Sequence, residues 1–169
     1  MIDPTARRIV CDTGPLISLE KLRGGYQFIR RLFDQLIVPP AVLDELSENL
    51  YASAEAYLQE HNLHDLLVVE GRTLALSRET QHLDLGERQA IALAIELNLP
   101  LLIEEEAGRA VARDLGIEIS GIAGQLFRAV RQQFLSSEEA LAHLARLRES
   151  GRINRQIYAA VRDAIEDEV

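Results

Sequence analysis

The sequence contains a single cysteine and no long apolar run. One cysteine, Cys11, excludes an internal disulfide bond and a zinc site with several cysteine ligands. Because Cys11 stands in an apolar segment, we expect it to be a small buried side chain without a catalytic role. No run of about 18 apolar residues is present, so we expect no transmembrane helix. Arg7, Arg8 and Asp12 interrupt the apolar core that a signal peptide requires, and the expected location is therefore the cytoplasm.

Lysine is almost absent, since Lys21 is the only one. The net charge of -9 argues against nonspecific DNA binding, because such binding depends on cations that neutralise phosphates. It does not exclude a nuclease, because acids that bind metal count as negative in the tally. Two groups of arginines could contact phosphate or, as we favour, form a solvated or ion-paired surface. They are Arg23, Arg30 and Arg31 early in the chain and Arg146, Arg148, Arg152 and Arg155 late in it.

Short apolar runs alternate with helical patterns along the chain, which is typical of β-α-β units and a parallel sheet. We therefore predict an α/β fold. The length of 169 residues suits one domain, and no repeat or linker divides the chain. We expect a single domain over residues 1–169, with C-terminal helices at about 137–167 packed on the core. The predicted strands are 8–12, 36–38, 66–69, 101–104 and 117–119.

Helix-start and helix-stop residues mark several of the predicted helices. Gly14-Pro15 begins the first, since a proline at this position loses no hydrogen bond. Asp84 and Glu87 form a capping-box pattern before a helix that ends at Asn98, and Ser136 and Glu139 have the same spacing at the start of a later helix. Residues 70–82 are predicted to form a polar connection. The predicted helices are 14–22, 26–33, 41–50, 52–61, 85–97, 121–134, one that begins after Ser136, and 154–165.

Acidic residues stand at four places where strands and helices could bring them together. Asp12 and Glu104–Glu106 each follow an apolar strand, whereas Asp44–Glu45 and Glu87 lie on helices. Ligands of open α/β folds bind at the carboxyl ends of parallel strands, so these acids could converge. Two carboxylates about 4 Å apart repel by roughly 4 kcal/mol at an effective dielectric of about 20, so a converged cluster favours a bound cation. The pattern predicts a Mg²⁺ or Mn²⁺ site.

Each acid also has a purely structural interpretation. Asp12 could cap the helix that follows it, and Glu87 could serve only the capping box. Asp44–Glu45 and the run Glu104–Glu106 could be solvated surface. The metal-site hypothesis rests on the four places taken together.

Two further spacings are weaker signals. His61 and His64 have the spacing of a metal pair on one helical turn, but no third ligand is evident nearby, and we favour an ordinary polar turn. Gly121 and Gly124 could present backbone N–H groups to a phosphate, but packing is the simpler interpretation.

Four segments carry a family pattern, in order and over most of the chain: IVCDTGPLISLEKL, PPAVLDEL, LDLGERQAIALA and LLIEEEAGRAVARDLGIEISG. Together they resemble the PIN-domain nucleases, especially the small VapC-like proteins of bacteria and archaea. This resemblance implies a three-layer α/β/α fold with a central parallel sheet. It also implies an acidic pocket that binds Mg²⁺ or Mn²⁺ and cleavage of single-stranded RNA.

The resemblance assigns roles to single residues. Asp12 matches the aspartate of the first strand, Glu45 the acid of the helix after the second strand, and Glu87 the acid of LGE. Glu104 matches the acid that ends the fourth strand, and Thr13 the hydroxyl residue beside the first aspartate. By this resemblance the four acids would hold one or two metal ions that activate a water for attack on a phosphodiester. Thr13 would orient Asp12 or a bound water.

The chain departs from the family pattern at two places. Glu104 stands where the family usually has aspartate, and its extra methylene could shift a metal, so Glu105 is a candidate substitute ligand. Ile122 stands near a position that is often polar, with only Ser120 available there. These departures motivate an alternative hypothesis, a catalytically weak or inactive PIN-like module that binds RNA or protein.

The leading hypothesis is a metal-dependent endoribonuclease that acts as the toxin of a type II toxin-antitoxin pair. The resemblance implies an RNA substrate, a cognate antitoxin protein and a homodimer, and no membrane partner is expected. A third hypothesis is phosphoryl transfer with Asp12 as the nucleophile. It would require a general acid two residues later, where the chain has Gly14.

Overall fold

The computed structural model describes residues 4–48 and 50–168, and the chain forms two compact units. The sheet unit comprises residues 1–16 and 33–120, and the helical unit comprises residues 17–32 and 121–169. The chain therefore passes from one unit to the other three times. The expected single domain over residues 1–169, with its C-terminal helices packed on the core, stays a prediction.

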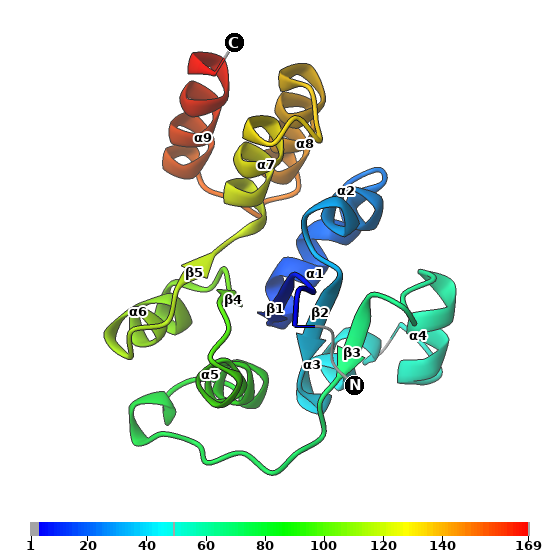
Figure 1. The fold of residues 1–169 in the computed structure, drawn as a ribbon, viewed down its shortest axis with the longest axis vertical. Helices are drawn as coiled ribbons and strands as arrows, with labels where there is room; N and C mark the ends of the chain where they lie inside the picture. The colour runs from blue at the N-terminus through cyan, green and yellow to red at the C-terminus, as the bar shows by residue number, and fades with distance from the viewer. Residues whose placement is uncertain (1–3, 49, 169) are drawn as a thin grey trace. The chain divides into compact units, whose positions relative to one another are not determined.

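Within the described residues, the sheet unit contains five parallel strands (Figure 1). Each of them overlaps a predicted strand, and the α/β class is confirmed. In spatial order they are β3 (Leu67–Val69), β2 (Gln35–Val38), β1 (Arg8–Cys11), β4 (Leu101–Leu102) and β5 (Ile119–Ser120).

The order in which strands are added reverses at β1. After β1 the chain adds β2 and β3 on one side, and then crosses over to add β4 and β5 on the other side. In open α/β sheets, ligands bind outside the carboxyl ends of the strands at such a reversal. The strands concerned are β1 and β4, where Val10 pairs with Leu101 and Cys11 with Leu102.

Runs of consecutive buried side chains stabilise the strands. β1 and β2 each end in three consecutive buried residues, the pattern of parallel strands that are covered on both faces. Helix α5 (Leu85–Leu97) supplies Ile91 and Leu93 to the same core as Val10 and Leu101. Burying one such side chain contributes roughly 1.5–3 kcal/mol, so this core stabilises the packing of α5 on β1 and β4.

Helix α5 begins and ends as the sequence predicts. The Asp84 carboxylate accepts a hydrogen bond from the backbone N–H of Glu87 at 2.8 Å, and the Glu87 carboxylate accepts one from the backbone N–H of Asp84 at 3.3 Å. This reciprocal pair is the predicted capping box. Asn98 ends the helix in a left-handed conformation with φ 51.

Other helices of the sheet unit surround the strands. The connection over residues 70–82 contains the short 3-10 helix η1. Helix α6 begins directly after Glu105, so Glu106 is an exposed residue in the first turn of a helix. None of the described helices is long and apolar enough to cross a membrane. The bounds are α3 (Pro40–Ser47), α4 (Ala54–Glu60), η1 (Arg78–Thr80) and α6 (Glu106–Asp114).

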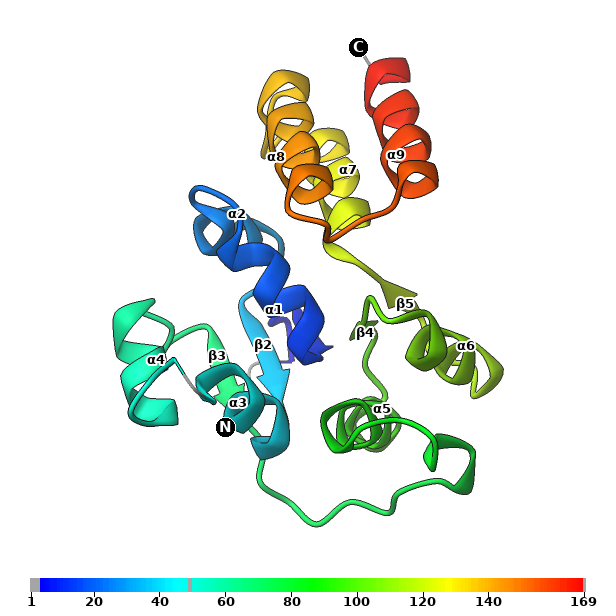
Figure 2. The ribbon, with the colours of Figure 1, turned by 180° about the vertical axis from the view of Figure 1, so that it is seen from behind.

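In the helical unit, α7, α8 and α9 pack against one another (Figure 2). Leu126, Leu144 and Ile165 are buried, one from each of these helices. Helix α2 contacts α7, and helix α1 runs from the sheet unit into the helical unit. The bounds are α1 (Thr13–Glu20), α2 (Gly25–Leu32), α7 (Ile122–Arg131), α8 (Ser137–Glu149) and α9 (Arg155–Asp167).

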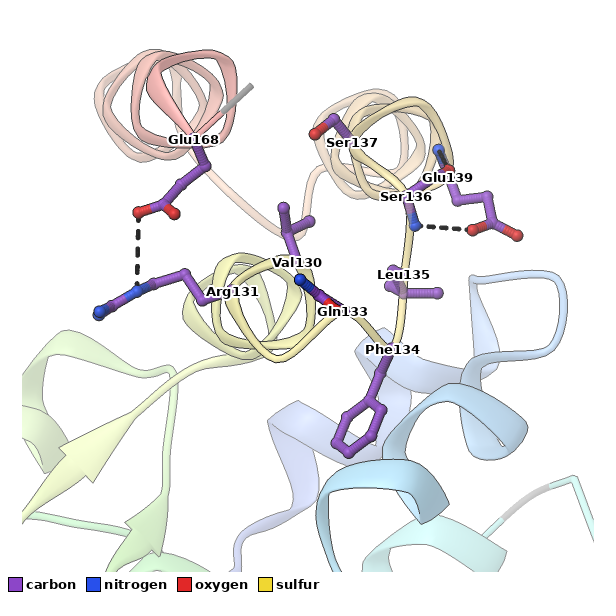
Figure 3. Close-up of a pocket in the computed structure, with 9 residues that line it drawn as sticks. All are labelled: Val130, Arg131, Gln133, Phe134, Leu135, Ser136, Ser137, Glu139 and Glu168. Atoms are coloured by element: carbon purple, nitrogen blue, oxygen red, sulfur yellow. Dashed lines mark hydrogen bonds and ion pairs between the residues drawn. The ribbon is translucent and has the colours of Figure 1, made fainter.

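Polar contacts fix the start of α8 and connect α7 to α9 (Figure 3). The backbone N–H of Ser136 donates to the Glu139 carboxylate at 2.8 Å, and the Ser136 hydroxyl accepts from the backbone N–H of Glu139 at 3.1 Å. This is a second capping box, at the helix start that the sequence predicts. Arg131 Nε lies 3.6 Å from Glu168 Oε1, which pairs the ends of α7 and α9.

Candidate metal centre at the carboxyl ends of β1 and β4

Asp12 stands directly after β1, at the reversal of strand order. Its backbone N–H donates to the carbonyl oxygen of Leu102 at 3.0 Å, which ties it to the end of β4. Its side chain is only 3% exposed, and its Oδ1 has no hydrogen-bond partner among the described residues. A buried charged oxygen without a partner is costly and needs an explanation.

The environment of Asp12 opposes its ionisation. Burial raises the pKa of the Asp12 carboxyl from an ordinary value of 3.8 to about 7. The negative charges of Glu87, Asp84 and Glu45 also raise this pKa, while a hydrogen bond from the Thr13 backbone lowers it. Asp12 therefore lies close to three other acids of the sheet unit, in a place where its own charge is unfavourable without a cation.

Glu87, at the start of α5, repeats this pattern. Its Oε2 accepts the capping bond from Asp84, but its Oε1 is buried and has no partner among the described residues. Burial raises the pKa of the Glu87 carboxyl, followed by the charges of Asp84, Glu105 and Glu45. The capping box therefore explains one of the two oxygens of Glu87 and leaves the other unexplained.

Glu45 is held by two hydrogen bonds. The Thr13 hydroxyl donates to Glu45 Oε2 at 2.5 Å, and the Gly86 backbone N–H donates to Glu45 Oε1 at 3.2 Å. These bonds connect α3 to the start of α1 and to the first turn of α5. Thr13 thus donates to Glu45, whereas the family resemblance implied that it would orient Asp12 or a bound water. Its neighbour Asp44 is exposed, which agrees with the solvated interpretation of that residue.

Two glycines let the acids approach the backbone. A Cβ on Gly86 would lie 2.6 Å from Glu45 Oε1, and a Cβ on Gly108 would lie 2.9 Å from Glu87 Oε1. The same atom on Gly108 would lie 2.6 Å from Ile103 Cδ1. Any larger residue would push one of the two carboxylates out of its present position.

Glu104 and Glu105 follow β4 and differ in their surroundings. Glu104 is half-buried, and its charge adds to burial and to Asp12 in raising the pKa of the Cys11 thiol. Glu105 is exposed at the start of α6, and its charge raises the pKa of Glu87. Arg109 Nη1 donates to the carbonyl oxygen of Ile103 at 2.8 Å, which anchors the turn that carries both acids.

The family model DUF3368, described as a PIN domain, matches residues 8–167. The chain belongs to the PIN-domain family. None of the curated proteins matches it. Among solved structures, the chain is similar to a domain of a functionally unknown protein from Methanocaldococcus jannaschii DSM 2661, with 21% identity and a TM-score of 0.43 over 69% of this chain and 91% of that one.

Family membership confirms the predicted PIN-like fold, a three-layer α/β/α arrangement around a central parallel sheet. PIN domains are in general metal-dependent nucleases, so a nuclease-like activity on nucleic acid and a divalent cation are the properties that the family assigns to this chain.

The acids of this PIN domain provide oxygen ligands, which Mg²⁺ and Mn²⁺ prefer. The oxygens that fit a cation best are Asp12 Oδ1 and Glu87 Oε1, because they are buried and unpartnered. In the described part of the chain, no three Asp, Glu, His or Cys side chains stand close enough together to hold one metal ion. In the present conformation, these two oxygens are the ligands best placed for a cation. Further protein ligands would require other acidic side chains to rotate toward it.

Asp84 is a member of the acidic cluster that the sequence interpretation missed. We expected it to be an N-cap only, but its charge also raises the pKa values of Asp12 and Glu87. The spacing DLGE was a sufficient signal, because a capping box places both carboxylates on the same first turn.

His61 and His64, whose spacing would suit a metal pair, contact other side chains instead. The Tyr51 hydroxyl lies 2.8 Å from His61 Nε2, and His64 Nε2 lies 2.6 Å from Glu55 Oε1. These contacts agree with the polar turn that we favoured over a metal pair.

Proposed function

We propose that this PIN domain is a Mg²⁺- or Mn²⁺-dependent endoribonuclease. The observation that carries the proposal is the pair of buried carboxylates, Asp12 and Glu87, each with one oxygen that no described group satisfies. Buried carboxylates without a partner destabilise the fold and occur mainly at functional sites. A divalent cation bound by the acids would offset this destabilisation. The family supplies the reaction class, the hydrolysis of nucleic acid.

Each proposed site residue has a distinct task. Asp12 and Glu87 would hold the cation through their free oxygens, and Glu45 is kept beside them by Thr13 and by the Gly86 backbone. Glu104 and Glu105 would complete the ligand set from the turn after β4. When bound, the cation would polarise a phosphodiester and lower the pKa of a coordinated water.

The substrate and the biological role are further parts of the proposal. Single-stranded RNA as substrate, and a role as the toxin of a type II toxin-antitoxin pair, are supported by the resemblance of four ordered segments to VapC-like proteins. The same resemblance supports a cognate antitoxin, a homodimer and a cytoplasmic location. A monomeric mass in light scattering would contradict the homodimer.

Metal binding is the first test, because it requires no knowledge of the substrate. Protein stripped with EDTA is titrated with Mn²⁺ by calorimetry, beside the variant Asp12→Asn. We expect binding in the wild type and its loss in the variant. Incubation of both with single-stranded RNA and Mn²⁺ should then give cleavage by the wild type alone. RNA cleavage that survives in Asp12→Asn would refute the proposed site.

A second candidate function is a PIN-like module that binds RNA or protein without cleaving it. It is favoured by one observation, that no three potential ligands converge among the described side chains, together with Glu104 at a position where aspartate is usual. In that case calorimetry would detect no Mn²⁺ binding, while the protein would still form a stable complex with RNA or with the product of a neighbouring gene.

A further inference from the structure

The helical unit contains an open groove between the α1–α2 turn and helix α8, with a volume of about 870 Å³. Lys21 and Arg23 line it from the turn, and Arg146 lines it from α8. All three side chains are exposed. Three cations therefore face one groove in a chain whose net charge is -9.

These cations are available to a ligand. Within the described residues, Lys21 and Arg23 form no ion pair. Arg146 Nε donates to the carbonyl oxygen of Lys21 at 3.3 Å, which holds the α1–α2 turn against α8. Its Nη1 is 3.9 Å from Glu149, a long contact that competes weakly with a bound anion. By contrast, Arg131 in the neighbouring hollow of Figure 3 is paired with Glu168.

The other titratable groups in the groove leave its charge positive. Glu139 is the acid among the lining residues, and its carboxylate already accepts the N–H of Ser136 in the capping box of α8. His143 is half-buried against the ring of Phe28, with ring centroids 6.3 Å apart. Burial lowers the pKa of His143, so its ring is neutral at neutral pH.

We infer that this groove binds the sugar-phosphate backbone of single-stranded RNA. The identity of the ligand rests on the proposed ribonuclease function, but the site is separate from the acids of the sheet unit. Phosphate contacts need cations and polar donors, and Gln27 adds an amide to the three cations. An acidic protein would also need buried apolar or aromatic anchors, whereas Ala142 is the only apolar side chain among the lining residues.

The test measures RNA binding without cleavage. A fluorescein-labelled oligouridine of about 20 nucleotides, longer than most single-strand sites, is titrated with full-length protein in EDTA, and its fluorescence anisotropy is followed at several salt concentrations. The groove variant is Lys21→Gln/Arg23→Gln/Arg146→Gln. The matched control is Arg131→Gln/Arg148→Gln/Arg155→Gln, which removes the same charge from exposed positions of the same unit that do not line the groove.

The groove variant should bind the oligouridine at least about tenfold more weakly near 0.1 M salt, and the logarithmic salt slope should fall by about 2, since each phosphate contact on a single strand contributes about 0.7. The control should change affinity less than about threefold, because its arginines act only through the general charge. Equal weakening by both variants, or no binding by the wild type, would overturn the inference. So would an unchanged RNA affinity in a groove variant that has lost binding to polyglutamate, since the groove would then fit an acidic protein.

A cleavage assay separates this inference from the proposed function. If the wild type binds oligouridine through the groove but does not cut it with Mn²⁺, the groove stands and the nuclease proposal fails. If the wild type cuts RNA and the groove variant has the same KM, the nuclease stands and the groove does not bind substrate.

Discussion

The two units of the molecule differ sharply in charge. The sheet unit carries 19 of the 27 acidic residues and 7 of the 18 basic ones, whereas the helical unit carries 8 acidic and 11 basic residues. The net charge of -9 therefore hides a strongly acidic unit and a mildly basic one. The whole-chain value is a poor guide to polyanion binding, because recognition depends on the local charge at a site.

The buried polar groups of the candidate site differ in their hydrogen bonding from the buried hydroxyl of Ser18. In the sheet unit, Asp12 and Glu87 each bury an oxygen that no described group satisfies. In the helical unit, the buried Ser18 hydroxyl accepts a hydrogen bond from Arg152 Nε at 3.0 Å. The candidate site thus costs stability, as functional sites often do, while the contact between Ser18 and Arg152 stabilises the fold.

The largest effect is expected from Asp12→Asn in the sheet unit. If Asp12 is the metal ligand that we propose, its loss removes several kcal/mol of stabilisation and should lower RNA cleavage by about a thousandfold, because each 1.4 kcal/mol is about a factor of ten in rate. The same substitution should raise the stability of the metal-free protein, because it removes a buried charge. Cleavage rates and urea unfolding in EDTA measure the two effects. A variant that is both inactive and less stable would mean that Asp12 acts mainly in folding.

Stability of the metal-free protein should fall as the pH rises from about 4 to about 7. In this window a folded Asp12, with its pKa raised to about 7, keeps a proton that the unfolded chain has lost near its ordinary 3.8. The difference corresponds to at most about 4 kcal/mol, and the raised pKa of Glu87 acts in the same direction. Urea unfolding at a series of pH values in EDTA tests this, with Asp12→Asn as the control that flattens the curve. A stability that rises over this window would contradict the burial of Asp12.

Glycine-to-alanine substitutions in the two units should change the free energy of unfolding in opposite directions. Gly108→Ala would place a Cβ 2.6 Å from Ile103 Cδ1 and 2.9 Å from Glu87 Oε1, and should cost about 1–3 kcal/mol and weaken Mn²⁺ binding. Gly124→Ala, in the first turn of α7, meets nothing within 4 Å and should stabilise by about 0.4–1 kcal/mol. Thermal unfolding and calorimetry measure both. Equal behaviour of the two variants would mean that Glu87 moves aside without cost.

The sequence predicted the elements better than the contacts between them. The strands and both capping boxes depend on residues a few positions apart, so periodicity and cap spacing were sufficient. The hydrogen bond from Thr13 to Glu45 joins residues 32 positions apart, and no local pattern specifies which acid accepts the hydrogen bond of a given hydroxyl. The unpartnered oxygens of Asp12 and Glu87 are likewise a property of the packed core. The pairing of residues 17–32 with residues 121–169 in one compact unit also depends on contacts across nearly 90 residues, which no local pattern specifies.

Two hydroxyl groups on helix α1, one in each unit, differ in their hydrogen-bond partners. Thr13 belongs to the sheet unit and donates to Glu45, whereas Ser18 belongs to the helical unit and accepts from Arg152. Thr13→Val should weaken Mn²⁺ binding by about tenfold, as loss of a group that orients a metal ligand typically does, and should change stability little. Ser18→Ala should cost about 1 kcal/mol of stability and leave Mn²⁺ affinity unchanged, because it removes only a structural hydrogen bond.

Calorimetry and urea unfolding of these two variants, with Thr13→Ser as a conservative control that keeps the hydroxyl, would resolve the two roles. Thr13→Ser should retain Mn²⁺ affinity, because its hydroxyl can still donate to Glu45. If Thr13→Val lowered stability and left Mn²⁺ affinity intact, Glu45 would be a structural acid and the ligand set would have to be drawn from Asp12, Glu87 and the acids after β4. The hydroxyl at position 13 therefore decides whether the acid of α3 belongs to the metal site.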